Sequence, residues 1–505
     1  MTKRNSDHIE MNTVTRRELI GGTARLGLLA AGGMLAGSAC AETEGEKSKV
    51  DRGLPARGEY LIQGAYVLSM DPVIGHIDLG DVHVKNGKIV AVASGVSAPG
   101  AEVIDGAGMI VMPGFIDTHW HMWHAIFRNF LREGLSYFPV KYALSEHFMP
   151  EDVHNGNRLA LAEAINAGFT TVHNFAHNVR SPEYADAEIS AWAEFGMPGR
   201  YSYGWKDGHP FTEIDPSDDL ERFQKEWIGP DSPTRGLMDL GRAVRGPMYT
   251  KHEIYAPEIE AAYALDLPIT MHAGITRART ISAAKLHEEG FLNDRTLLVH
   301  FLLANSKDRA AMAEAGTSLS STIKSEMRGQ KDGGFRRNLL HMLNDGINVC
   351  LSGVDANVTG ASSMFDAMST AWVVGVPRST DDTSELKAVE YSTCLQMSIV
   401  NGAKALGLGD VTGSLTPGKR ADLILVRAND LNMVPFHDAN SAIVKSARVA
   451  NVDTVMIDGR IRKREGKLIG IDVPEIAANA ARSLHNVRTR AGGDWASKST
   501  KIPAF

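Results

Sequence analysis

Cysteine is scarce in this chain, whose 505 residues contain only Cys40, Cys350 and Cys394. Three cysteines cannot build a disulfide framework, so a hydrophobic core must hold the fold together. Cys350 and Cys394 lie in apolar, regularly patterned segments, which is typical of small core residues. Hydrophobic residues make up 43% of the chain, enough for a large core and more than one domain.

Long apolar runs and clusters of basic residues are also missing. No apolar stretch is long enough to predict a transmembrane helix in the mature chain. The formal net charge is -7 and no dense basic patch occurs, so we expect no nucleic-acid partner. The first predicted strand is not followed by a glycine-rich nucleotide loop, which disfavours a doubly wound open sheet.

The N-terminal segment has the composition of an export signal. Arg16 and Arg17 precede a weakly hydrophobic, glycine-rich run over residues 19–39, which resembles a twin-arginine signal. We predict a signal peptide over residues 1–41 and a polar linker over residues 42–57. The alternative is a disordered N-terminal arm.

The end of this segment allows two outcomes after export. Ser38-Ala39-Cys40 looks like a lipoprotein box, which predicts lipidation of Cys40 and anchoring to a membrane. Gly37 stands where such boxes favour leucine, and the small residues around Cys40 also fit ordinary cleavage and release. The predicted location is therefore the periplasm or the membrane at the cell envelope.

The middle of the chain alternates strand and helix patterns. Helical patterns such as residues 153–167, 282–289 and 307–315 lie between short apolar runs. Eight predicted strands over about 290 residues match an α/β fold of the (β/α)8 TIM barrel type. These strands cover residues 109–116, 170–175, 200–203, 240–244, 269–272, 296–300, 317–321 and 348–351.

Two strand-rich segments flank this region, and Asn86-Gly87 in the first is a strong hairpin signal. We predict that both flanks pair into one small β-sandwich. The expected domains are a first sandwich part, the barrel, a second sandwich part and a C-terminal helix with a tail. Their predicted bounds are residues 58–112, 113–412, 413–470 and 471–505.

A pair of histidines stands at the end of the first predicted strand, in Pro113-Gly114-Phe115-Ile116-Asp117-Thr118-His119-Trp120-His121. Alternate residues of a strand point to the same side, so His119 and His121 would project together. Paired imidazoles at such a position form half of a divalent-metal site. The simpler interpretation of an isolated His-x-His is two histidines in a polar loop.

Further polar residues follow the other predicted strands. In a barrel the reactive groups gather where the strands end at their carboxyl side. Burying several polar groups together is costly unless a metal or a hydrogen-bond network satisfies them. The strand-end residues are His173, His177, Arg245, His272, His300 and Asp355.

Three motifs resemble the amidohydrolase superfamily, and the resemblance covers residues 58–467. They are the His119-Trp120-His121 motif with its preceding strand, the series His272, His300 and Asp355, and Gly413-Ser414-Leu415-Thr416-Pro417-Gly418-Lys419-Arg420-Ala421-Asp422-Leu423. Within the superfamily the chain is most similar to the group of triazine hydrolases and cytosine- and guanine-type deaminases.

The resemblance implies a role for each matching residue. One Zn²⁺ or Fe²⁺ would be bound by His119, His121, His272 and Asp355. His300 would contact the water on the metal or the developing oxyanion of the substrate, and Asp355 would take a proton from that water. Binuclear relatives use a carboxylated lysine at the end of the fourth strand. Residues 240–244 contain no lysine and Arg245 follows them, which favours one metal ion.

The chain departs from the deaminase pattern after the fifth strand. Many deaminases carry a glutamate three residues after that strand's histidine, whereas this chain has Ile275. The missing carboxylate makes a purine or pyrimidine deaminase the alternative rather than the leading hypothesis. Glu326, after the seventh strand, is the candidate replacement, and its simpler interpretation is an exposed loop acid.

Residues for substrate contact are predicted from their positions. Trp123 follows the first strand and would form part of an aromatic wall, or it packs under the loop as core. Arg245 would bind a carboxylate or carbonyl of the substrate, or it forms a structural salt bridge. His177 would donate to the substrate, or it caps a loop.

The leading hypothesis is a metal-dependent amidohydrolase that cleaves a non-peptide C–N bond, either amide-like or an exocyclic amine, in a small aromatic or heterocyclic compound. The alternatives are a deaminase of a purine- or pyrimidine-like base and a non-catalytic binding barrel. A barrel that catalyses C–C cleavage is a further candidate. We also expect a homo-oligomer.

Overall fold

The computed structural model describes residues 53–131, 135, 137–276, 279–329, 334–353 and 360–497. The chain divides into two compact units, residues 1–49 and residues 50–505, and every described residue belongs to the second. The predicted signal peptide, with Cys40, therefore lies outside the described residues. None of the described helices has the length and apolar character needed to cross a membrane.

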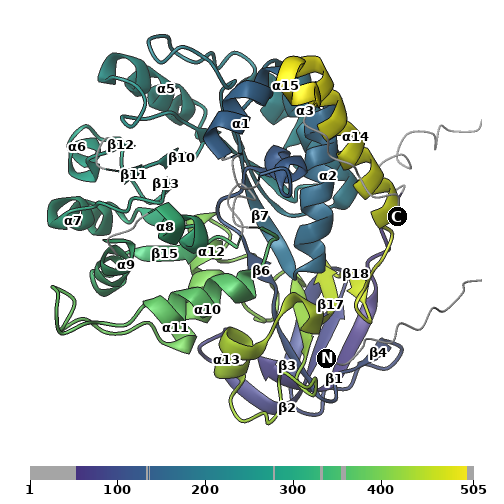
Figure 1. Ribbon diagram of the computed structural model, residues 1–505. Coiled ribbons are helices and arrows are strands. Elements are labelled where there is room, and N and C mark those ends of the chain that lie inside the picture. Colours follow the sequence, from purple (N-terminus) through teal and green to yellow (C-terminus); the bar gives the residue numbers. More distant parts are fainter. Residues whose placement is uncertain are drawn as a thin grey trace, which may run out of the picture. The chain divides into compact units, whose positions relative to one another are not determined.

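The described residues contain a nearly closed barrel of eight parallel strands (Figure 1). Each strand pairs with the next one along the chain, as predicted for a (β/α)8 barrel, and the predicted bounds differ by at most two residues after the first strand. The strands are β6 (Phe115–Ile116), β7 (Phe169–Ala176), β8 (Gly199–Tyr203), β9 (Met238–Ala243), β10 (Ile269–His272), β13 (Thr296–Val299), β14 (Ser318–Ser321) and β15 (Asn348–Leu351).

The first predicted strand differs from expectation, because residues 109–116 divide between two sheets. Strand β5 (Met109–Pro113) joins the flanking sheet, and β6 joins the barrel. Gly114 separates them, and a Cβ atom there would lie 2.2 Å from a side-chain atom of Thr170. Only glycine allows the chain to pass this close to β7 while it changes sheets.

Hydrogen bonds around one carboxylate join the two ends of the barrel sheet. The backbone nitrogen of Gly353 donates to Oδ2 of Asp117 at 2.7 Å, and the Ser352 hydroxyl donates to the same carboxylate at 3.2 Å. The Thr118 hydroxyl also donates to the carbonyl oxygen of Leu351. The residues that follow β6 are thereby held against those that follow β15.

Helices alternate with the barrel strands, and several begin at residues whose side chains cap them. The side chain of Asn305 accepts hydrogen bonds from Lys307 and Asp308 and so caps one helix, and Ser282 caps another. The helices of this region are α2 (Pro150–Asn166), α3 (Pro182–Phe195), α4 (Leu220–Trp227), α5 (His252–Ala264), α6 (Ala283–Glu288), α7 (Ser306–Ala315), α8 (Ile323–Gly329), α9 (Gly334–Asn344), α10 (Met364–Val374), α11 (Tyr391–Ser398) and α12 (Val400–Ala405).

Shorter elements lie after β6, after β10 and between β16 and β17. The segment after β6 forms a 3-10 helix, η1, followed by α1. These elements are η1 (Met122–Phe127), α1 (Tyr137–Leu144), η2 (Ser145–His147), the hairpin β11 (Gly274–Thr276) and β12 (Arg279–Thr280), α13 (Ala439–Ser441), the π-helix η3 (Ala442–Ser446) and η4 (Val449–Asn451).

The two flanking segments form one mixed sheet, of nine strands within the described residues. The predicted turn at Asn86-Gly87 joins β2 and β3, and both residues have positive φ. The predicted β-sandwich is thus one continuous sheet with its own apolar core. Its strands are β1 (Glu59–Leu68), β2 (His76–Lys85), β3 (Lys88–Ala93), β4 (Glu102–Asp105), β5, β16 (Leu423–Arg427), β17 (Val452–Ile457), β18 (Arg460–Arg464) and β19 (Lys467–Leu468).

The predicted C-terminal helix is α14 (Val473–Ala491), and it packs against α2 and η1. Its residues Ala480 and Val487 enter the apolar cluster that contains Trp123, and Asn155 of α2 donates to the hydroxyl of Ser483 at 3.0 Å. A short helix, α15 (Gly493–Ser497), follows within the predicted loose tail. The end of the chain therefore supports the segment that follows the first barrel strand.

Candidate metal centre

Three predicted metal ligands meet at the carboxyl end of the barrel. His119 and His121 follow β6, and His272 ends β10. One ligand nitrogen from each of the three lies within 4.8 Å of the others. The centroid of the His119 ring lies 4.6 Å from that of the His121 ring and 5.0 Å from that of the His272 ring. Three imidazole nitrogens grouped this closely could hold one metal ion.

The protonation of these histidines also suits a metal. Burial, followed by the charge of neighbouring His300, holds the pKa of His119 well below its usual range. Burial and the neighbouring imidazoles lower the pKa of His121 and His272 in the same way. Metals bind neutral imidazole, so a low pKa removes competition from protons.

Hydrogen bonds orient the ligand rings. Nδ1 of His121 lies 3.0 Å from the carbonyl oxygen of Phe175 and donates to it, which leaves Nε2 as the ligand nitrogen. Nδ1 of His272 is buried and has no hydrogen-bond partner among the described residues. A buried polar atom without a partner is costly, and a bound cation would satisfy it. The three residues therefore fit a divalent ion.

Two further predictions about the metal concern the fourth ligand, Asp355, and the absence of a bridging lysine. Asp355, the predicted fourth ligand and proton acceptor, lies outside the described residues. Strand β9 contains no lysine, and both Lys206 and Lys251 are exposed. The described residues thus offer no carboxylated lysine at the end of the fourth barrel strand.

His300 stands beside the three histidines and is tied to Glu326. Its ring lies 5.4 Å from that of His272, and its Nδ1 is 3.2 Å from Oε1 of Glu326. Glu326 is 2% exposed and belongs to α8, so it is not the exposed loop acid that was the simpler interpretation. The Ser321 hydroxyl and the backbone nitrogen of Thr322 donate to its carboxylate.

The backbone at His300 supports a functional role. His300 has a φ of 72° and Phe301 a φ of 38°, both in the left-handed region that non-glycine residues seldom adopt. This conformation ends β13 one residue earlier than predicted and turns the imidazole toward His272. Strained backbone of this kind is concentrated at functional sites.

His173, another histidine of the predicted strand ends, forms hydrogen bonds within the protein through both of its ring nitrogens. Its Nδ1 donates to the carbonyl oxygen of Thr118 at 2.6 Å, and its Nε2 accepts from the Ser202 hydroxyl at 2.7 Å. Burial, followed by the charge of Arg200, lowers its pKa to about 3, so the ring is neutral. Both nitrogens are occupied, and His173 links β7 to the segment that carries His119.

The buried carboxyl group of Glu188 supports the start of η1 through Asn174. The side-chain oxygen of Asn174 accepts from the backbone nitrogen of Met122 at 3.2 Å, and its amide donates to Glu188 at 2.8 Å. Burial raises the pKa of Glu188 to about 8 despite this hydrogen bond. The carboxyl group is therefore protonated at neutral pH and anchors the start of η1 through Asn174.

The three predicted substrate-contact residues have different surroundings. Trp123 is fully buried in an apolar cluster with Phe127 and Phe148, as its alternative interpretation as a core residue expects. Its predicted contact with a substrate stays a prediction. Its indole nitrogen donates to Nδ1 of His177 at 3.4 Å. The ring of His177 lies 4.3 Å from that of His121. His177 therefore borders the candidate metal centre, and the Trp123 indole holds the His177 ring by a hydrogen bond.

Arg245 is enclosed by partners within the protein. Its guanidinium is fully buried, forms an ion pair with Glu258 and donates to the carbonyl oxygens of Pro210 and Glu213. These partners occupy the donors that a substrate carboxylate would need. The structural salt bridge that was the alternative interpretation of Arg245 is therefore present, and the predicted substrate contact stays a prediction.

The sequence did not indicate a second polar group beside the centre. Nζ of Lys141, in α1, lies 2.8 Å from Oδ1 of Asp207, which follows β8. The Lys141 charge contributes to the lowered pKa of His121, His177 and His272, so the ammonium lies near all three. Lys141 and Asp207 are 66 positions apart and belong to no motif, so only folding reveals the pair.

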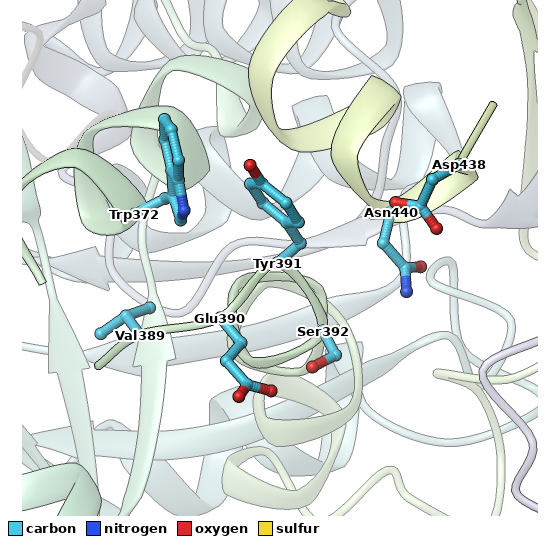
Figure 2. Close-up of a pocket in the computed structure, with 7 residues that line it drawn as sticks. All are labelled: Trp372, Val389, Glu390, Tyr391, Ser392, Asp438 and Asn440. Carbon is cyan, nitrogen blue, oxygen red and sulfur yellow. The ribbon is translucent and has the colours of Figure 1, made fainter. Parts of the chain in front are cut away.

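A separate cavity of about 400 Å³ has none of these residues in its lining. Figure 2 shows the residues that line it. The ring of Trp372 in α10 lies 5.1 Å from that of Tyr391 in α11. Nζ of Lys445 is 5.7 Å from the Trp372 ring and 5.9 Å from the Tyr391 ring, so a cation of the protein already covers them. The lining shares no residue with the histidine cluster and includes residues of α10 and α11.

Comparison with known proteins supports a family assignment. The model of the family described as Amidohydrolase family matches residues 110–462. The chain is 28% identical to a 5'-deoxyadenosine deaminase of Methanococcoides burtonii over 86% of this chain and 98% of the relative. It is also 28% identical to a 5-methylthioadenosine/S-adenosylhomocysteine deaminase of Desulforudis audaxviator, over 85% of this chain and 98% of the relative.

Solved structures show a similar fold. An adenosine deaminase from Xanthomonas campestris with bound zinc has a TM-score of 0.70 at 24% identity, covering 86% of this chain and all of that one. A mutant atrazine chlorohydrolase from Arthrobacter aurescens, complexed with zinc and atraton, has a TM-score of 0.72 at 21% identity. It covers 84% of this chain and all of that one.

Proposed function

Because this chain belongs to the amidohydrolase family, we propose that it is a metal-dependent deaminase that removes the amino group from the purine ring of an adenosine-like nucleoside. The observation that carries the proposal is the meeting of His119, His121 and His272 beside the His300–Glu326 pair. The curated relatives named above are deaminases of adenosine-type nucleosides and match this chain over most of its length.

Zinc is the proposed metal, because neutral imidazole nitrogens in a compact group suit it and two similar structures contain it. His119, His121 and His272 would hold the ion, with Asp355 as the proposed fourth ligand. A bound divalent ion supplies Lewis acidity and lowers the pKa of water. One ion is proposed, since β9 provides no lysine.

His300 and Glu326 would handle charge and protons on the substrate. With Nδ1 of His300 directed at Glu326, Nε2 is the nitrogen that would donate to the developing oxyanion. The carboxylate holds the ring in that orientation and stabilises its protonated form. Asp355 would accept the proton that water loses, and the departing amine needs one proton in return.

Ile275 favours a second candidate function. A deaminase of a purine must protonate a ring nitrogen, and the position three residues after His272 carries no acid in this chain. A hydrolase that cleaves an amide-like or exocyclic C–N bond of a small heterocycle without that step would not need one. If the chain is a purine deaminase, Glu326 is the carboxylate that we propose for this proton transfer, because it is bonded to His300 beside the metal centre.

The test is to load the purified mature chain with zinc and measure ammonia release from adenosine, 5'-deoxyadenosine and 5'-methylthioadenosine. Amides and amino-triazines serve as the comparison set. We expect ammonia and the inosine-type product from at least one nucleoside, and no turnover by the His119→Ala or Asp355→Asn variant. Turnover of the comparison set alone would replace the first candidate by the second.

A further inference from the structure

Four polar side chains form a group on one side of the candidate metal centre, here termed the distal polar cluster: His124, Lys141, His177 and Asp207. They lie in η1, in α1 and in the segments after β7 and β8. His300 and Glu326 come from the segments after β13 and β14. In the strand order of the barrel, β7 and β13 are separated by three strands in one direction, so the two groups face the centre from different sides.

The cluster adjoins the metal ligands directly. The ring of His177 lies 4.3 Å from that of His121, and the ring of His124 lies 5.6 Å from it. His177 in turn lies 3.9 Å from Asp207, measured from Nε2 to Oδ1. A ligand of nucleoside size whose reacting atom sat at the metal would therefore reach the cluster with its other end.

Two buried polar atoms in the cluster have no hydrogen-bond partner among the described residues: Oδ2 of Asp207 and Nε2 of His124. Oδ1 of Asp207 accepts from Lys141, and Nδ1 of His124 lies 3.3 Å from the Tyr137 hydroxyl. The side chain of Asp207 is only 3% exposed, so water satisfies little of it. Polar atoms buried in this way are normally paired, and a ligand with hydroxyl groups would pair them.

The charge of the cluster limits what it can bind. Lys141 and Asp207 form an ion pair, so together they carry no net charge. A cation would need surplus negative charge, which this ion pair does not supply. A neutral group that both donates and accepts hydrogen bonds fits, because its O–H can donate to Asp207 while its oxygen accepts from Lys141.

We propose that the distal polar cluster binds the sugar hydroxyls of the substrate, with Asp207 accepting from a hydroxyl and Lys141 donating to its oxygen. This inference rests on the proposed function, since it assigns the end of the nucleoside that lies away from the scissile C–N bond. It makes Asp207 and Lys141 specificity-determining residues.

The first experiment compares adenosine with 2',3'-dideoxyadenosine as substrates of the zinc-loaded wild-type enzyme. Because a buried hydrogen-bond acceptor left unpaired is costly, we expect kcat/KM to be about 10- to 100-fold higher for adenosine. The Asp207→Asn variant should lose most of this preference while it still turns over the dideoxy compound. Equal use of both nucleosides by the wild type would overturn the inference without using any variant.

Asp215→Asn is the matched control. Asp215 lies in the same connection between β8 and α4, is buried and forms an ion pair with Arg242, but does not belong to the cluster. Its replacement should lower stability and leave the ratio between the two nucleosides unchanged. A loss of the ratio in both variants would mean that the whole connection, rather than Asp207, determines the preference.

Binding measurements separate this inference from the proposed function. Calorimetry with inosine and 2',3'-dideoxyinosine, which are deaminated products, on the zinc-loaded protein needs no turnover. Tighter binding of inosine, lost in Asp207→Asn, supports the cluster even if no nucleoside is deaminated. Deamination without any difference between hydroxylated and dideoxy compounds overturns the cluster and keeps the function. Absence of both binding and turnover overturns both.

Discussion

Burial decides the chemical state of the individual side chains around the metal centre. His119 and His121 are almost inaccessible to solvent, and their low pKa follows mainly from that burial. The sequence identified both residues and His272, because a strand end with alternating histidines is a local pattern. It could not show that Arg245 is enclosed by Glu258, since that contact depends on how α5 packs.

Metal content is the direct test of the ligand assignment. We expect about one equivalent of zinc per chain in the reconstituted wild type and a loss of most of it in His272→Ala, because one of three described nitrogen ligands is removed. Elemental analysis after dialysis measures it. His287→Ala, on the partly exposed face of α6, is the control and should keep its metal. Retention of a full equivalent by His272→Ala would refute the assignment.

Glu188 should make stability depend on pH. Its pKa rises from 4.5 to about 8 on folding, so between these values the native state keeps a proton that the unfolded chain has released. Stability should therefore fall as pH rises from about 4.5 to 8, with a slope of up to about 1.4 kcal/mol per pH unit. Denaturation of the wild type and of Glu188→Gln across this range measures it.

The Glu188→Gln variant should lack this slope, because glutamine does not titrate. Glu194→Gln is the matched control on the same helix, since the Glu194 side chain is 45% exposed. It should retain the slope of the wild type. Parallel pH profiles for Glu188→Gln and the wild type would show that Glu188 is not protonated in the native state.

Contacts between secondary-structure elements position the metal ligands relative to one another. The Asp117 carboxylate ties the residues after β6 to those after β15, and its Oδ1 also accepts from the backbone nitrogen of His119. Asp117 stands in the motif that the sequence singled out, yet nothing in the sequence says that it joins the first and last barrel strands. Its partners Ser352 and Gly353 are 235 and 236 residues away.

Replacing Asp117 by alanine should destabilise the barrel by about 2–4 kcal/mol, because it leaves buried N–H groups without an acceptor. The shift of the denaturation midpoint measures this loss. Asp266→Ala is the control: Asp266 is 91% exposed and pairs with Arg295 at the surface, so its replacement should change stability by less than about 1 kcal/mol. An equally small effect in Asp117→Ala would mean that the barrel ends are held by other contacts.

For the chain as a whole, distant segments meet in both the flanking sheet and the C-terminal helix. Strand β5 pairs with β16, so that Pro113 lies opposite Leu423. Helix α14 covers the apolar cluster that supports η1. The flanking sheet and α14 thus support the region around β6 and the residues that follow it, among them His119. The expected homo-oligomer stays a prediction.

Export is a proposal about the N-terminal segment. We propose that residues 1–41 direct export through a twin-arginine route, and replacing Arg16 and Arg17 by lysine should leave the precursor inside the cell. Cell fractionation followed by mass analysis of the N-terminus measures it. A lipid on Cys40 would place the enzyme at a membrane, whereas a mature chain that begins beyond Cys40 would show release. Normal export of the double lysine variant would contradict the proposal.

Local pattern was enough to predict the barrel strands, several helices and the strand-end positions of the histidines in the candidate metal centre, because hydrophobic periodicity and strand alternation act over a few neighbouring residues. The sheet change at Gly114, the burial of Glu326 and the surroundings of Trp123 depended on packing between distant segments. The Lys141–Asp207 pair belongs with them, since an ion pair leaves no trace in sequence when its members are far apart. Periodicity therefore specifies the elements, and long-range packing specifies which of their polar residues face the site.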